Sequence, residues 1–164
     1  MRRAACIAAF AGLALMVVAT GIRAATCSVS SPGLAFGNYD VYSAAATNGT
    51  GTMNVSCTLD ASDGNNITVN YTISLSTGSS GGYVQRRMQS ATDTLGYNLY
   101  TVNTYSVVWG DGSGSTQTVA GQLKLTNGQP TRNNVHTVYG QIPPLQDVAV
   151  SNNYLDNVTV TVTY

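Results

Sequence analysis

The sequence predicts an all-β protein, a β-sandwich of about seven short strands with Greek-key connections. Two observations lead to this prediction. Apolar and polar residues alternate with a period of two over several stretches, and clusters of Gly, Ser, Asn and Pro separate these stretches. The composition agrees, because the chain has no glutamate and a single lysine but is rich in Thr, Val and Tyr, which favour strands over helices. Short strands at this spacing are typical of a sandwich, and no helix is expected.

The size and the charge of the chain limit its function. The chain has 164 residues, which suits one domain, and 9% of them are charged. Basic and acidic residues are equal in number, so the chain lacks the positive charge on which nucleic-acid binding depends. We therefore expect no nucleic-acid partner.

The clearest alternation lies in residues 67–76, where every second residue from Ile67 to Leu75 is apolar. Residues 52–59 follow the same pattern. Both segments are predicted to be half-buried antiparallel strands with one solvated face. The full set of expected strands is 27–29 with 34–36, 52–59, 67–76, 95–102, 105–109, 118–125, 135–142 and 155–164.

Residues 1–24 are predicted to be a secretory signal peptide, and residues 25–164 are predicted to be the folded domain. A positively charged start precedes an unbroken apolar stretch, and small residues follow it, which predicts cleavage after Ala24 or Ala25. A retained membrane anchor is the alternative, but the apolar stretch is shorter than the roughly 20 residues that a span requires. We therefore expect a secreted protein with no membrane span after cleavage.

Cys27 and Cys57 are the two cysteines that remain once Cys6 leaves with the signal peptide. Outside the cytoplasm two such thiols are expected to form a disulfide, which stabilises the fold by roughly 3 to 4 kcal/mol. A metal site is not expected, because two cysteines and the single histidine, His136, do not make the usual four-ligand shell of zinc. No cofactor is expected either.

Residues 111–115 contain an Asp-x-Ser-x-Ser motif, which has the spacing of some adhesion-type metal sites. No helix is expected after it, so a Gly-rich hairpin is the favoured interpretation. Catalysis is not expected, because no nucleophile, base and orienting group can be assembled around His136. One binding hypothesis stays open, in which Tyr105, Trp109 and Asp111 belong to a loop that recognises a sugar or a surface.

The final segment of the sequence has a regular alternation. Val158, Val160, Val162 and Tyr164 share one face with Tyr154, and Asn or Thr residues occupy the other. A strand of this regularity belongs inside a sheet, yet no further strand follows it in the sequence. The pattern therefore predicts an open groove beside the last strand, with free backbone groups and an apolar seam to which another strand can add.

Seven blocks of the sequence, taken in order, carry a family resemblance. They are Cys27 to Ser30 with Gly33 to Tyr39, Gly51 to Cys57, Tyr71 to Gly78, Leu95 to Tyr100, Val108 to Gly112, Val138 to Pro143 and Val158 to Tyr164. Together they resemble the spore coat protein U domain, which is shared with subunits of archaic chaperone-usher pili.

The resemblance implies an incomplete immunoglobulin-like sandwich. Its missing strand would come first from a periplasmic chaperone and later from the N-terminal extension of the adjacent pilus subunit, with an outer-membrane usher as a further partner. The resemblance places the disulfide at Cys27 and Cys57. The chaperone or donor-strand contacts fall on Val158, Val160, Val162 and Tyr164.

The start of the mature chain differs from that of a fibre-forming subunit. The expected cleavage would leave almost no residues ahead of Cys27, whereas a donor extension needs about ten residues in strand conformation. We therefore expect a subunit that accepts a strand but donates none, at a pilus tip or as an adaptor. The expected function is that of an exported, non-enzymatic structural surface protein, which passes through the periplasm to the cell surface, a pilus or a coat. A spore or cell-coat protein outside a fibre and an adhesin-like binding module are the alternatives.

Overall fold

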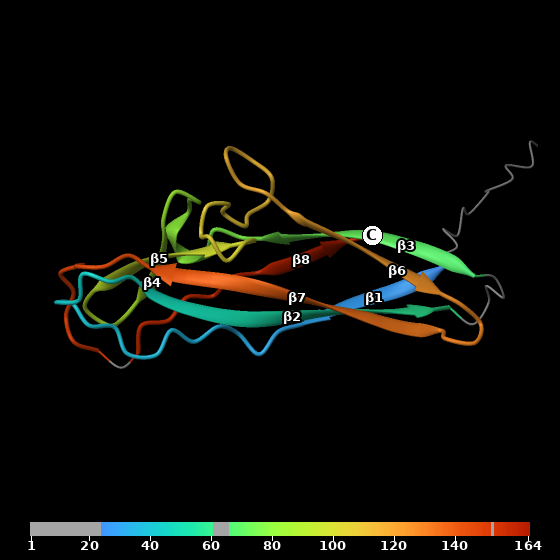
Figure 1. Ribbon diagram of the computed structural model, residues 1–164, viewed down its shortest axis with the longest axis horizontal. Coiled ribbons are helices and arrows are strands. Elements are labelled where there is room, and N and C mark those ends of the chain that lie inside the picture. The colour runs from blue at the N-terminus through green and yellow to red at the C-terminus, as the bar shows by residue number, and fades with distance from the viewer. Residues whose placement is uncertain (1–23, 61–65, 152) are drawn as a thin grey trace, which may run out of the picture.

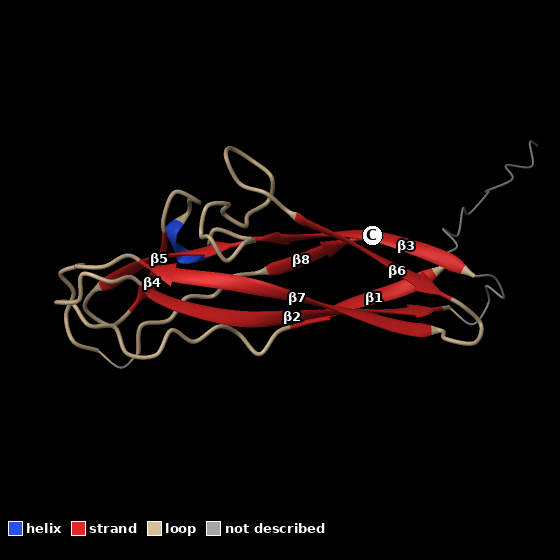
Figure 2. Ribbon diagram, viewed as in Figure 1, coloured by secondary structure: helices blue, strands red, loops and turns tan. Residues whose placement is uncertain are grey.

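The computed structural model describes residues 24–60, 66–151 and 153–164 and shows an elongated molecule built from two β-sheets (Figure 1). Strands make up nearly all of its regular structure (Figure 2). The expected signal peptide lies outside the described residues apart from Ala24. The strands are β1 (Ala25–Ser30), β2 (Thr47–Leu59), β3 (Ile67–Leu75), β4 (Arg86–Gln89), β5 (Thr94–Tyr100), β6 (Val119–Leu125), β7 (Thr131–Ile142) and β8 (Val160–Thr163).

The two sheets are antiparallel throughout. The larger has the order β1-β2-β7-β5-β4, and the smaller has the order β6-β3-β8. β2 and β7 are the longest strands and pair from Thr47↔Ile142 to Thr58↔Thr131. The chain passes from one sheet to the other between β2 and β3, β3 and β4, β5 and β6, β6 and β7, and β7 and β8. The prediction of an all-β sandwich is confirmed.

The core lies between the sheets and follows the alternation in the sequence. Inward residues of β2 and β3 are buried, and their neighbours on the outer face are exposed or half-buried. On the outer face amide side chains bond across strands, as between Gln141 and Asn48 (3.0 Å) and between Gln122 and Asn70 (2.8 Å). The largest apolar side chains that are fully buried are Trp109, Ile73, Leu75, Leu125, Ile142 and Val55.

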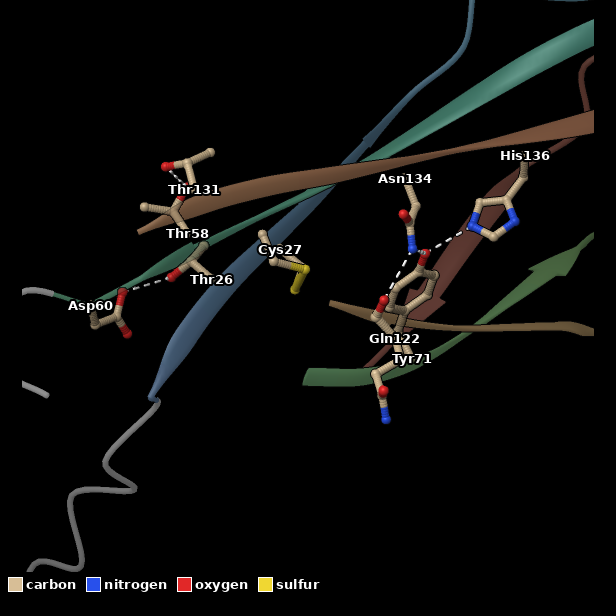
Figure 3. Close-up of a disulfide and its surroundings, with 10 residues drawn as sticks. Thr26, Cys27, Thr58, Asp60, Tyr71, Gln122, Thr131, Asn134 and His136 are labelled. Atoms are coloured by element: carbon tan, nitrogen blue, oxygen red, sulfur yellow. Dashed lines mark hydrogen bonds between the residues drawn. A yellow bond between two sulfur atoms is a disulfide. The ribbon is translucent and has the colours of Figure 1, made fainter. Parts of the chain in front are cut away.

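The disulfide joins β1 to β2. Cys27 and Cys57 are directly opposite in the register of the two strands, and their Cα atoms are 4.1 Å apart. Thr26 adds a hydrogen bond from its hydroxyl to the Asp60 carboxylate (3.2 Å) beside it (Figure 3). The predicted disulfide is confirmed, and it fixes β1 to the edge of the larger sheet.

The prediction of a strand at residues 34–36 is wrong. Leu34 and Phe36 instead cover the inner face of the larger sheet, where Gly49 and Gly140 lie opposite each other in β2 and β7. A Cβ atom on Gly140 would lie 2.7 Å from the Phe36 ring, so the absence of side chains at these glycines makes room for the two apolar residues.

Three further differences concern the lengths and the number of elements. Residues 105–109 are not a strand, because Tyr105 adopts a turn conformation with φ of 53°. β4 lies in a segment with two arginines that predicted no strand, and β8 is shorter than the expected 155–164. The one helical element in the described ranges is the 3-10 turn η1 (Gly78–Ser80). No helix in the part of the chain that the structure describes has the length and hydropathy to span a membrane.

A buried arginine ties β4 to the smaller sheet. Arg86 is fully buried, and its guanidinium donates to Ser76 O (3.0 and 2.8 Å), Trp109 O (2.8 Å) and Asn98 Oδ1 (2.7 Å). It also lies over the ring of Tyr83 at 5.2 Å. Because a buried cation is costly without such acceptors, this cluster holds the end of β3 and the Trp109 turn against β4.

Candidate functional site

An open groove runs between the edges of the two sheets. One wall is the segment 29–36, which includes the end of β1, and the other is the segment 154–160, which leads into β8. The hollow between these walls has a volume of about 550 Å³. Side chains from both sheets line it from the core: Met53, Leu75, Met88, Tyr97, Leu99 and Val138.

The backbone of β8 has one free edge on the groove side. Among the described strands β8 pairs with β3 alone. The hydrogen bond from Ser76 N to Thr159 O (2.9 Å) shows which residues face β3. Because these residues alternate in an antiparallel pair, Thr161 directs its backbone groups toward β3, whereas Val160 and Val162 direct theirs away from β3, toward the free edge.

The side chains of the final segment alternate between the core and solvent. Val158, Val160 and Val162 are half-buried and pack against the core, and the threonines between them are exposed. Tyr164 is 48% exposed. The groove therefore combines apolar side chains and free backbone groups along one segment. Contact between these four residues and a partner strand stays a prediction.

A second hollow lies further along β8. It has a volume of about 760 Å³ and is bounded by Ala24 and Ala25, by residues 67–70 and by residues 162–164. β1 and β8 also approach each other, with Cα atoms within 8 Å. A strand that follows the whole of β8 therefore has to widen the gap between these two edges.

One carboxylate lies in the groove. Asp156 accepts hydrogen bonds from the Tyr97 hydroxyl (2.7 Å) and from Ser79 N (2.9 Å). Burial of Tyr97, together with its bond to Asp156, raises the pKa of that phenol, which stays a donor. Sequence reasoning missed Asp156, although the alternation that predicts the inward face of Val158 also places Asp156 on it.

The expectation that Trp109 contributes to a surface-binding loop is wrong. Its side chain is 0% exposed, and its indole N–H donates to Ile73 O (3.0 Å) in the core. Tyr105 packs edge-on against Tyr100 with ring centroids 5.7 Å apart. Asp111 is exposed and accepts bonds from the hydroxyl and the amide of Ser113, which lower its pKa. A binding role for Tyr105 and Asp111 stays a prediction.

His136 takes part in a link between the sheets. The Tyr71 hydroxyl lies 2.8 Å from His136 Nε2, and Asn134 Nδ2 donates to the same hydroxyl (3.1 Å) (Figure 3). The Tyr71 hydroxyl can accept from Asn134 and at the same time donate to Nε2 when that nitrogen is unprotonated. Burial lowers the pKa of His136, which favours this neutral form. In the described residues no group of three or more His, Cys, Asp or Glu could hold a metal ion.

Two sheets, one disulfide and an unpaired strand edge define an incomplete immunoglobulin-like β-sandwich. The family model of the Spore Coat Protein U domain matches residues 13–161. Protein U of Myxococcus xanthus is 36% identical, over 84% of this chain and 77% of that protein. The chain therefore belongs to the Spore Coat Protein U domain family, as its sequence blocks predict.

A solved structure is also similar to this chain. It is the pre-assembly complex of a chaperone and a tip adhesion subunit from archaic chaperone-usher Csu pili of Acinetobacter baumannii. The identity is 19% and the TM-score is 0.49, and the match covers 85% of this chain. This chain spans 40% of the length of the solved chain.

Proposed function

We propose that the protein is an exported structural surface protein, a pilin-like subunit whose groove is filled by a β-strand from another protein. One observation carries the proposal: the backbone groups of Val160 and Val162 lie on the edge of β8 that faces away from β3, and the apolar side chains of Val158 and Val160 line the groove beside this edge. Buried backbone groups need hydrogen-bond partners, and an extended strand supplies both partners and apolar side chains. A helix would satisfy only the apolar side chains.

The groove gives such a strand enough contact to bind. Each apolar side chain that the strand buries contributes about 1.5 to 3 kcal/mol, and each backbone hydrogen bond adds about 1 kcal/mol. Three inward valines, spaced two residues apart, suit a donor with apolar residues at every second position. Three such side chains contribute several kcal/mol toward the cost of association.

The proposed partners are those of the chaperone-usher pathway. A periplasmic chaperone would fill the groove first, an adjacent subunit would replace it, and an outer-membrane usher would carry the exchange. Membership of the Spore Coat Protein U domain family and the free edge of β8 support a partner that supplies a strand. The unpaired edge also needs such cover, because an open edge invites aggregation.

We also propose that the signal peptide is removed after Ala24 or Ala25 and that the subunit occupies a tip or adaptor position. The disulfide at Cys27 holds β1 against β2, so residues from Ala25 onward are not free to lie along a neighbour. The mass of the secreted protein tests the cleavage. A mature chain with a long segment ahead of Ala25 would contradict both the cleavage and the tip position.

A coat protein that forms no fibre is the second candidate. The family is named for a spore coat protein, and the 36% identical relative is called Protein U. Immunogold labelling of intact cells distinguishes the two candidates. Label at filament ends supports the pilus subunit, and an even shell of label supports the coat protein.

Co-expression with a chaperone of the same pathway tests the main proposal. We expect the protein to co-purify with the chaperone as a one-to-one complex and to be scarce in the periplasm without it. A stable monomer that binds neither the chaperone nor an extended peptide would contradict the proposed function.

A further inference from the structure

The row of side chains that faces the groove contains one carboxylate. Tyr154, Asp156, Val158, Val160 and Val162 are half-buried, and the described residues between them are exposed. Asp156 lines the groove together with its hydrogen-bond partner Tyr97. A strand that lies along this row must place one of its own side chains near the carboxylate. The following inference rests on the proposed function, because it concerns the strand that fills the groove.

Asp156 keeps unused acceptor capacity in the open groove. An ionised carboxylate has about four acceptor positions, and its two bonds come from Tyr97 and Ser79. A Cβ atom on Gly78 would lie 2.1 Å from Asp156 Oδ2, so the turn before β4 packs directly against this carboxylate. The carboxylate is therefore held in place by two hydrogen bonds and by the packing of this turn.

A buried cation, Arg86, interacts electrostatically with Asp156. All the hydrogen bonds of Arg86 described above go to neutral oxygens. Burial lowers the pKa of Arg86, while the charge of Asp156 acts in the opposite direction. Arg86 and the Asp156 carboxylate therefore attract each other.

These contacts determine which side chain can lie opposite Asp156. An apolar side chain would remove water from the carboxylate without replacing its hydrogen bonds, and a second carboxylate would repel it. We infer that Asp156 selects the inserted strand at one position, where the strand must carry a hydrogen-bond donor such as a hydroxyl, amide or ammonium group. The positions opposite Val158, Val160 and Val162 prefer apolar side chains.

Peptide binding to the full mature chain tests this inference. The probes are eleven-residue peptides that alternate valine and threonine, in which each valine in turn is replaced by serine, lysine, leucine or aspartate. At one position we expect the serine and lysine peptides to bind at least about tenfold more tightly than the leucine peptide, and the aspartate peptide to bind undetectably. At the neighbouring inward positions the leucine peptide should bind most tightly.

Two variants tie this preference to Asp156. In Asp156→Leu the leucine peptide should become the preferred one at the selected position, and in Asp156→Asn the aspartate peptide should bind measurably. Thr161→Ala, at an exposed position outside the groove wall, is the matched control and should keep the preference of the parent. Asp156→Asn retains an acceptor for Ser79, so its binding to the aspartate peptide tests the role of the Asp156 charge even where Asp156→Leu fails to fold.

The outcomes separate this inference from the proposed function. Binding of the valine-threonine peptides with no position that favours a donor contradicts the inference alone. The same holds if Asp156→Asn excludes the aspartate peptide as strongly as the parent does, or if the donor preference survives in a folded Asp156→Leu. Failure of every peptide to bind the parent protein contradicts the proposed function and, with it, the inference.

Discussion

Val160→Asp places a charge in the groove wall and changes partner binding more than it changes the free protein. Val160 is half-buried, packs against the core and pairs with Leu75. In the open groove the new carboxylate can still reach water. When a strand docks, the carboxylate is buried without a partner, which costs several kcal/mol, and about 1.5 to 3 kcal/mol of apolar contact is lost.

The sum is large enough to abolish a complex of moderate affinity. A loss of about 4 kcal/mol weakens binding by about a thousandfold, because each 1.4 kcal/mol corresponds to a factor of ten. Thr161→Asp is the matched control, since Thr161 is the adjacent residue and its side chain is exposed on the other face. We expect this variant to bind nearly as well as the parent.

Co-purification with the chaperone, measured side by side for the two variants, gives the readout. Thermal unfolding of each free protein shows whether either substitution disrupts the fold. Equal loss of binding in both variants, or equal retention in both, would refute the assignment of Val160 to the groove face.

Three further predictions concern stability. Replacing Cys27 and Cys57 together by serine should lower the free energy of unfolding by roughly 3 to 4 kcal/mol and reduce the periplasmic yield; an unchanged urea midpoint would contradict a stabilising disulfide. Arg86→Met should lower the free energy of unfolding in urea by about 3 to 5 kcal/mol, because three oxygens lose the guanidinium as a donor. Arg86→Lys should recover little of this loss, because an ammonium group cannot reach all three oxygens as the planar guanidinium does. Full recovery by lysine would contradict this role of the guanidinium. Because burial lowers the pKa of His136 below the unfolded value of about 6.5, stability should hold above that pH and decline as the pH falls from about 6.5 through the lower folded pKa. His136→Gln, which still accepts from Tyr71, should flatten this decline in urea unfolding between about pH 7.5 and 5, and an identical slope in both proteins would contradict it.

The sequence predicts the long strands well because their patterns are local. Alternation identifies β2 and β3, and two cysteines in a chain that is expected to be exported suffice to predict the disulfide. Leu34 and Phe36 mislead the same reasoning, since an apolar pair looks like a strand wherever it is buried. Their true position depends on glycines in β2 and β7, which are distant in sequence and become adjacent only in the fold.

The candidate site is predicted in outline and not in its polar part. The alternation of Val158, Val160 and Val162 predicts the groove face, because one side of a strand must face the core. The burial of Trp109 could not be predicted from the sequence, because the turn of Gly, Asp and Ser that follows it favours an exposed position. In the structure its indole is fully buried in the core. Asp156 bonds to Tyr97 and interacts with Arg86, and both residues lie in strands far from it in the sequence. Only the packing of the sheets brings these segments together, so the sequence could not predict the contact.

Amide hydrogen exchange along β8, measured by NMR with and without the chaperone, tests the central claim most directly. The amides of Val160 and Val162 lie on the free edge of β8, whereas that of Thr161 already bonds toward β3. If a strand adds to the free edge, Val160 and Val162 should become strongly protected in the complex, and Thr161 should be protected in both states. A complex that forms while Val160 and Val162 exchange as fast as in the free protein would show that the partner binds elsewhere.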